Sequence, residues 1–106
     1  MTKPLGEVTQ HLRDQLAMFY GPRLKGIYVY GSYARGEEDE ESDLDVLVVL
    51  DRIDHYVGEI DRSGRIIADL SLEYEVSISR TFVSEEQWRT SDTFFLQNVR
   101  EEAVPA

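Results

Sequence analysis

Two aspartates, Asp43 and Asp45, stand where an acidic segment runs into an apolar one. Residues 37–45 hold seven carboxylates in nine positions, and residues 46–50 are all apolar. In a strand, side chains two apart share a face, so both carboxylates would project together from Cα atoms about 6–7 Å apart. Ionised carboxylates at the entry to a buried strand are unfavourable unless they are paired or bind a cation. The pair predicts a site for hard divalent ions, an arrangement that can clamp a transferring phosphoryl group.

The dipeptide Gly31-Ser32 could supply the second half of such a site. It ends the β-branched and aromatic segment LKGIYVYG. Glycine lets the backbone approach a ligand closely, and a turn that opens a helix presents free N–H groups to phosphate. The dipeptide alone is weak evidence. A strand before it, ten residues after it and then Asp-Leu-Asp opening another strand make the combination a strong prediction of a phosphate site.

The remaining periodicities indicate the elements that must position these residues. A helix is expected over 5–19, because apolar residues recur there at every third or fourth position and Gly21-Pro22 would end it. Near-continuous apolar character after Asp45 predicts a strand covered on both faces. Strands are expected over 24–31, 43–50 and 75–83, and further helices over 54–72, around Trp88 after an N-cap at Ser84, and over 93–100. The expected fold class is α/β: residues 1–106 form a single domain with a small mixed sheet and packed helices.

Composition narrows the possible partners. The chain has 106 residues, 42% hydrophobic and 30% charged, which is typical of a globular protein. It lacks cysteine, a signal-peptide core and a run of about 20 apolar residues. We therefore expect a cytoplasmic protein without a membrane partner. With 11 Lys+Arg against 21 Asp+Glu, the surface favours cations and basic proteins, and direct nucleic-acid binding is not expected.

The motif as a whole resembles a known family. Gly31-Ser32, ten residues and then Asp43-x-Asp45 is similar to the signature of the polymerase-β-like nucleotidyltransferases. The stretch GSYARGEEDEESDLDVLVV most resembles the minimal nucleotidyltransferase (MNT) branch, and length and element order agree with it. The resemblance implies Mg²⁺ on Asp43 and Asp45, and ATP phosphates on Gly31 and Ser32. It further implies an antitoxin that transfers AMP from ATP to a tyrosine of a HEPN-family ribonuclease toxin.

One position departs from the family pattern. Relatives usually supply a third carboxylate from the next strand, near Ser77 in YEVSIS. Glu75, on the same face of that strand, is the candidate replacement as a metal ligand, and Glu73 is another. Without a replacement, the second metal would be weakly held or the enzyme slow.

Other readings of the same residues remain open. The chain could be a catalytically degenerate antitoxin that neutralises a basic partner by binding alone, or a nucleotidyltransferase that acts on a small molecule. Residues 37–41 are either a solvated loop or a docking face. Arg35 contacts either a triphosphate or this acidic loop. His11 and His55 lack a second histidine at ligand spacing, so a surface placement is expected for both.

Overall fold

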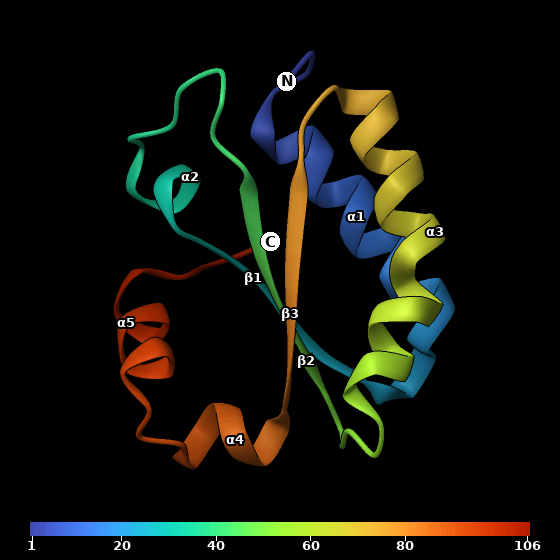
Figure 1. Ribbon diagram of the computed structural model, residues 1–106, viewed down its shortest axis with the longest axis vertical. Coiled ribbons are helices and arrows are strands. Elements are labelled where there is room, and N and C mark those ends of the chain that lie inside the picture. Colours follow the sequence, from blue (N-terminus) through green and yellow to red (C-terminus); the bar gives the residue numbers. More distant parts are fainter.

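The computed structural model describes all of residues 1–106 and has one four-stranded sheet with helices on both faces (Figure 1). The helices are α1 (Leu5–Tyr20), α2 (Ser32–Arg35), α3 (Tyr56–Tyr74), α4 (Glu85–Thr90) and α5 (Phe94–Glu102), with a 3-10 turn, η1, over Gly21–Arg23. The strands are β1 (Leu24–Tyr30), β2 (Leu44–Leu50), β3 (Ile78–Ser84) and β4 (Val104–Pro105). The predicted α/β class is confirmed.

The sheet is mixed and has the order β3-β2-β1-β4. Strand β2 pairs antiparallel with β1 and parallel with β3, and β4 pairs antiparallel with β1. A parallel pair needs a crossover that returns the chain to the same end of the sheet, and α3 provides it. The chain from β1 to β2, in contrast, only has to turn back, so the acidic segment and α2 lie at one end of the sheet.

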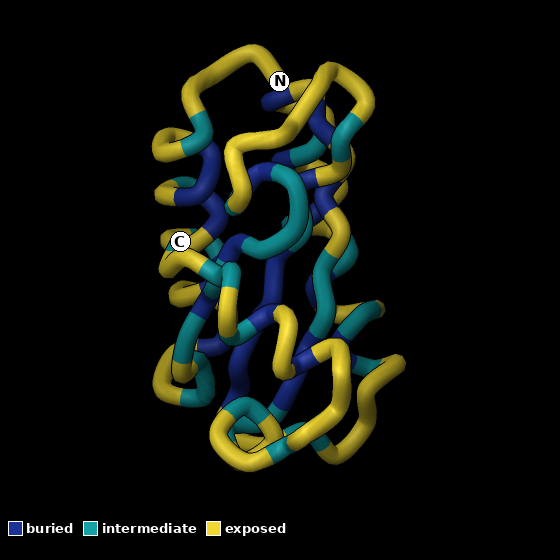
Figure 2. The backbone as a smooth tube through the Cα atoms, turned by 90° about the vertical axis from the view of Figure 1, so that its left-hand side faces the viewer, coloured by how far each residue is buried: buried dark blue, intermediate teal, exposed yellow.

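Strand β2 is buried on both faces, as its apolar sequence predicts. Leu44, Val46, Val48 and Leu50 belong to the main core with α1 and α3, whereas Leu47 and Val49 pack against Leu96 and Val99 of α5. In Figure 1 the two layers lie on opposite sides of the sheet, with α1 and α3 on the right and α5 on the left. Figure 2 shows the buried strands in dark blue inside a shell of exposed loops and helix surfaces.

The ends of several elements follow local sequence signals. Helix α1 ends at Tyr20, because Gly21 has a positive φ of 56° and Pro22 follows in η1. The expected N-cap at Ser84 is confirmed: its hydroxyl accepts from the Gln87 N–H while the Gln87 side chain accepts from the Ser84 N–H. Thr93 caps α5 by a single bond, because its hydroxyl accepts from the Leu96 N–H.

The main differences from the sequence prediction concern the end of α3, the start of β3 and the presence of β4. Helix α3 runs to Tyr74, whose buried ring continues the apolar stripe of Ile67 and Leu70, so β3 begins at Ile78 and not at residue 75. Strand β4 was not predicted, because two residues carry no periodicity and their pairing depends on the free edge of β1. No helix of this fold combines the length and apolar character that a membrane crossing requires.

Candidate active site

Gly31 and Asp45 lie against each other, although 13 positions separate them in the chain. Tyr30, the last residue of β1, is the antiparallel partner of Asp45 near the start of β2. Gly31 has φ 74°, a conformation that other residues rarely adopt, and a Cβ added there would overlap the Asp45 carboxylate oxygen Oδ2. Both the backbone and the carboxylate therefore require glycine, and the two halves of the sequence motif form one site.

The turn after β1 has the geometry of a small anion-binding loop. The N–H groups of Ala34 and Arg35 donate to the Gly31 carbonyl at 3.1 and 3.2 Å. Ser32 and Tyr33 open the helix, where amides have no intrahelical acceptor. Gly36, with φ 70°, ends the helix after four residues. With the Ser32 hydroxyl, the turn has several groups that can donate to a phosphate next to Asp45.

The electrostatics of Asp45 favour a bound cation. Burial raises the pKa of this half-buried carboxyl above its ordinary value, and Asp43 and Glu102 raise the pKa further, whereas Arg35 opposes them. Asp43 is exposed and directly precedes β2. Two carboxylates in this environment repel unless positive charge separates them, and oxygen donors suit a hard divalent ion. The donor set therefore fits Mg²⁺.

The third carboxylate has no counterpart in the fold. No group of three His, Asp or Glu side chains is placed to hold a metal. The residue of β3 opposite Asp45 is Ser79, and not Ser77. Ser77 precedes the strand, and its carbonyl accepts from the Leu44 N–H at 2.8 Å. Glu75 is exposed and caps α3 in a left-handed conformation, φ 53°, before the strand begins. The fold does not group Glu75 with the two aspartates, and its role as a ligand stays a prediction.

An ion pair that the sequence does not reveal joins the C-terminal segment to this site. Arg35 Nη1 lies 2.7 Å from Glu102 Oε2, and Arg35 Nε lies 3.5 Å from Glu37 Oε2. Glu102 arrives here because β4 pairs with β1, with Val104 opposite Val29. The pair spans 67 positions in the chain, so no local pattern could have indicated it. One of the two predictions for Arg35 was a contact with the acidic loop, and the ion pair with Glu37 confirms it. The shorter contact of Arg35 is with Glu102 of α5.

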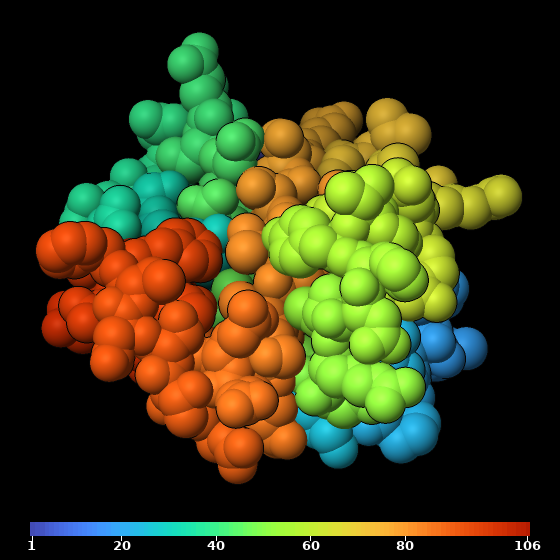
Figure 3. Space-filling view, turned by 60° about the horizontal axis from the view of Figure 1, so that its bottom comes forward, coloured from blue at the N-terminus to red at the C-terminus, as the bar shows by residue number.

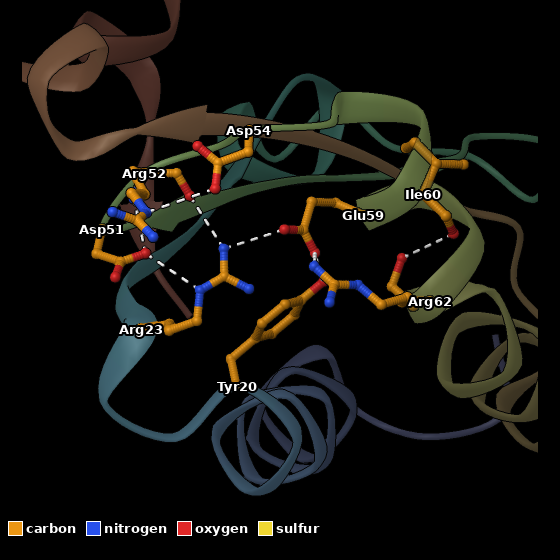
Figure 4. Close-up of polar contacts among 9 residues, drawn as sticks. Tyr20, Arg23, Asp51, Arg52, Asp54, Glu59, Ile60 and Arg62 are labelled. Carbon is orange, nitrogen blue, oxygen red and sulfur yellow. Dashed lines mark hydrogen bonds and ion pairs between the residues drawn. The ribbon is translucent and has the colours of Figure 1, made fainter.

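A second charged cluster lies at the opposite end of β1 and β2 (Figure 4). The carboxylate of Glu59, only 2% exposed, contacts Arg62 at 2.6 Å, Arg23 at 3.0 Å and the Tyr20 hydroxyl at 3.3 Å. Burial favours the protonated acid, but the two guanidinium groups outweigh it and lower the pKa of Glu59. Burial and Glu59 raise the pKa of Tyr20 to about 12. The cluster fastens α1 and η1 to α3, which is a structural role.

The glycine turn lies against Asp45 at one end of a small mixed sheet, the arrangement that the sequence predicts for a phosphate-transfer site. Comparison of the sequence with known families agrees: residues 10–103 match the nucleotidyltransferase domain family. The match spans most of the chain and includes both halves of the site. The chain belongs to the nucleotidyltransferase domain family.

Relatives of known sequence carry a more specific description. Two predicted protein adenylyltransferases of Methanocaldococcus jannaschii are similar over most of their length. One is 42% identical over 84 residues, 78% of each chain. The other is 29% identical over 98 residues, which cover 92% of this chain and 94% of the relative.

Solved structures share the fold. A predicted minimal nucleotidyltransferase is 25% identical with a TM-score of 0.61, covering 98% of this chain and 97% of that one. A toxin–antitoxin complex with AMP-PNP has 21% identity and a TM-score of 0.63, covering 91% and 70%. A complex of the tri-AMPylated Shewanella oneidensis HEPN toxin with its MNT antitoxin has 17% identity and a TM-score of 0.54, covering 92% and 70%. The resemblance to the minimal branch is confirmed.

Proposed function

We propose that this nucleotidyltransferase moves AMP from ATP to a hydroxyl, a tyrosine in our reading, on a HEPN-family toxin and thereby acts as its antitoxin. The observation that carries the proposal is the contact of Gly31 with Asp45, which brings the turn after β1 against an aspartate of β2. In this proposal the turn binds phosphate, and Asp43 and Asp45 bind a cation. The predicted adenylyltransferase relatives support the protein acceptor. The fold neighbours solved with AMP-PNP and with an AMPylated HEPN toxin support the donor and the partner.

Each site residue has a role in this reaction. The acceptor oxygen forms a bond to the α-phosphorus, the bond from that phosphorus to the bridging oxygen breaks, pyrophosphate leaves and the hydroxyl proton goes to solvent. Asp43 and Asp45 would hold Mg²⁺, which when bound neutralises phosphate charge and favours the deprotonated acceptor. The amides that follow Gly31 and the Ser32 hydroxyl would hold the β- and γ-phosphates, which become the leaving group.

In this proposal the partner supplies the acceptor surface. All elements of residues 1–106 build or cover the one sheet. The exposed acidic loop, residues 37–41, stands beside the site and would attract a basic surface near the acceptor. A hetero-oligomer with the toxin is therefore part of the proposal.

Mass spectrometry of the purified partner toxin tests the transfer directly. With ATP and Mg²⁺, the toxin should gain about 329 Da per adenylate, the mass that this transfer adds. Omission of the metal, or the double variant Asp43→Ala/Asp45→Ala, should abolish the gain. A toxin that is fully neutralised but unmodified would contradict the proposal.

Neutralisation by binding alone is the second candidate, and the lack of a three-carboxylate group favours it. The two candidates differ in dose. An enzyme should neutralise its partner below one-to-one stoichiometry and lose this ability in the Asp43→Ala/Asp45→Ala variant. A binding protein should require one-to-one amounts, with wild type and variant equally effective. Transfer to a small molecule, the third reading, would leave the toxin both unmodified and active.

A further inference from the structure

A hollow of about 520 Å³ lies at the carboxyl end of β3, outside the phosphate turn and the aspartate pair. Figure 3 looks onto this end of the molecule, where α3, α4 and α5 come together around β3. Half of its 12 lining residues are hydrophobic. The volume is within the range of pockets that bind small molecules. We call it the β3 hollow; its lining includes Tyr56, Thr81, Phe82, Ser84, Gln87 and Phe95.

The hollow begins near the phosphate site and extends away from it along β3. The phosphate turn follows β1 and Asp45 lies near the start of β2, whereas the hollow runs from Thr81 toward the carboxyl end of the parallel strand β3. Ser79 is opposite Asp45, and Thr81 is two residues further along the same face. From strand spacing and rise, the Thr81 Cα lies about 8 Å from the Asp45 Cα, whereas Ser84, at the far end of the hollow, lies about 17 Å from it. The ribose of a nucleotide can span the shorter separation, so the base would enter the hollow at its Thr81 end.

Phe95 can serve as an aromatic wall on the side of the β3 hollow that is nearer to Tyr30 and Asp45. Its ring packs edge-to-face on Tyr30, with centroids 5.6 Å apart and planes at 85°. Tyr30 is the strand partner of Asp45, and its hydroxyl lies 3.4 Å from the Thr81 hydroxyl. Tyr30 thus fixes a ring that is still 43% exposed. The preceding Phe94, 85% exposed, does not line the hollow.

We propose that the β3 hollow binds the nucleobase of the donor nucleotide, with Phe95 as the stacking surface. The proposal rests on the proposed function, since it places the base of the nucleotide whose phosphates lie at Gly31 and Asp45. Apart from Asp54, the polar residues of the lining are neutral, and the Thr81 hydroxyl, at the end nearer Asp45, suits the hydrogen-bonding edge of a base. A basic segment of a partner protein would instead be drawn to the acidic loop.

Titration calorimetry with two ligands isolates the base from the phosphates. Wild type should bind MgATP more tightly than Mg-tripolyphosphate. Phe95→Ala should lower the affinity for MgATP roughly fivefold or more, the loss expected for one stacking contact, and should leave the affinity for Mg-tripolyphosphate unchanged. Phe94→Ala is the matched control on the same helix and should change neither. Phe95→Leu keeps bulk against Tyr30 without the aromatic face and should also weaken MgATP, whereas Phe95→Tyr should restore it.

Each remaining outcome is decisive. Equal MgATP affinity of Phe95→Ala and wild type would overturn the proposal. If Phe95→Ala leaves the MgATP affinity unchanged and raises the KM for the partner, the proposal is also overturned, because the hollow is then the pocket for the acceptor. Equal weakening of both ligands in Phe95→Leu would show that Phe95 only supports the fold. If wild type binds neither ligand, the proposed function itself fails. If it binds tripolyphosphate as tightly as MgATP, only the nucleobase assignment fails.

Discussion

At the scale of single residues, the site depends on a carboxylate held in an unfavourable environment. The pKa of Asp45 is raised by burial, then by Asp43 and Glu102. A carboxyl whose pKa is higher in the folded state than in the unfolded state destabilises the fold when ionised. This penalty is present above the folded pKa and disappears as the pH falls below the unfolded value. At neutral pH the metal-free protein therefore carries the penalty, and a bound cation would remove it.

Replacing either aspartate should separate catalysis from folding. Asp43→Ala and Asp45→Ala should each abolish adenylate transfer. Without metal, their free energies of unfolding should equal or exceed that of wild type, because a repulsive charge is removed. Urea denaturation and transfer of labelled ATP measure the two effects. Full transfer by either variant would end the catalytic assignment.

Gly31 should be indispensable for a reason that Gly36 does not share. Both have positive φ, 74° and 70°, but only at Gly31 would a Cβ meet a neighbour, the Asp45 carboxylate. Gly36→Ala should destabilise the fold by about 1–2 kcal/mol through its left-handed backbone, and Gly31→Ala by at least as much, because φ 74° with ψ −155° is a region almost confined to glycine. Only Gly31→Ala should also lose metal binding and transfer, since it displaces Asp45. Wild-type transfer rates in Gly31→Ala would refute the close approach.

At the scale of elements, two long-range ion pairs hold helices to the sheet. Glu59 fastens α3 to the corner formed by α1 and η1, at the end of the sheet away from the aspartates. Glu102 fastens the end of α5 to Arg35 in α2, directly after the phosphate turn. The first pair is buried on its acidic side and should matter for stability. The second is half-exposed, so its energetic contribution should be small.

Glu59 should make the stability of α3 sensitive to acid. Its pKa is lowered, so its contribution is present above the unfolded pKa, about 4.3, and is lost as the pH falls through the lower folded pKa. Glu59→Gln should reduce the free energy of unfolding by about 1–3 kcal/mol at pH 7. Urea denaturation from pH 7 to 3 should show this difference shrinking with acid. The exposed Asp61→Asn on the same helix is the control, and a pH-independent difference would contradict the ion-pair account.

The acidic loop should act on association and leave the chemistry intact. Glu37 pairs with Arg35, and Asp39 accepts hydrogen bonds from the Glu41 N–H and the Ser42 hydroxyl. The test variant therefore leaves Glu37 and Asp39 unchanged. Changing Glu38, Glu40 and Glu41 to lysine should slow association with a basic partner and flatten its salt dependence. Stopped-flow mixing at several salt concentrations measures this. The same change at Glu7, Asp61 and Asp69, exposed acids of the opposite layer, should have a smaller effect; an equal effect would mean that only net charge matters.

At the scale of the whole molecule, negative charge and ligand binding are coupled. The net charge is −10, and the aspartate pair lies at the end of the sheet where the acidic loop gathers. A cation bound there relieves local repulsion, and it stabilises only the folded state. Metal and nucleotide should therefore raise the resistance of the entire fold to heat.

Thermal unfolding should report this coupling. Mg²⁺ should raise the Tm of wild type, and Mg²⁺ with ATP should raise it further, because ligands that bind only the native state stabilise it by mass action. Asp43→Asn should lose both increments. Scanning calorimetry with and without each ligand measures them. If Asp43→Asn shows the same rises in Tm as wild type, the cation binds elsewhere, for which the acidic residues 37–41 are the first candidates.

The sequence by itself determined the features that depend on local order. Apolar spacing defined α1, and alternation defined the two faces of β2, because each element repeats with its own period. The Ser84 cap and the Gly31-Ser32 and Asp43-x-Asp45 motif were readable for the same reason, since their parts lie within a few residues or on consecutive elements.

Only the tertiary structure decided what depends on the pairing of distant segments. The parallel register of β2 with β3 set Ser79, and not Ser77 or Glu75, opposite Asp45. The pairing of β4 with β1 delivered Glu102 to Arg35. The packing of α5 on Tyr30 turned Phe95 toward the β3 hollow. Strand register and helix docking arise from side chains that meet across the core, and no periodicity within a single segment records which partner they meet.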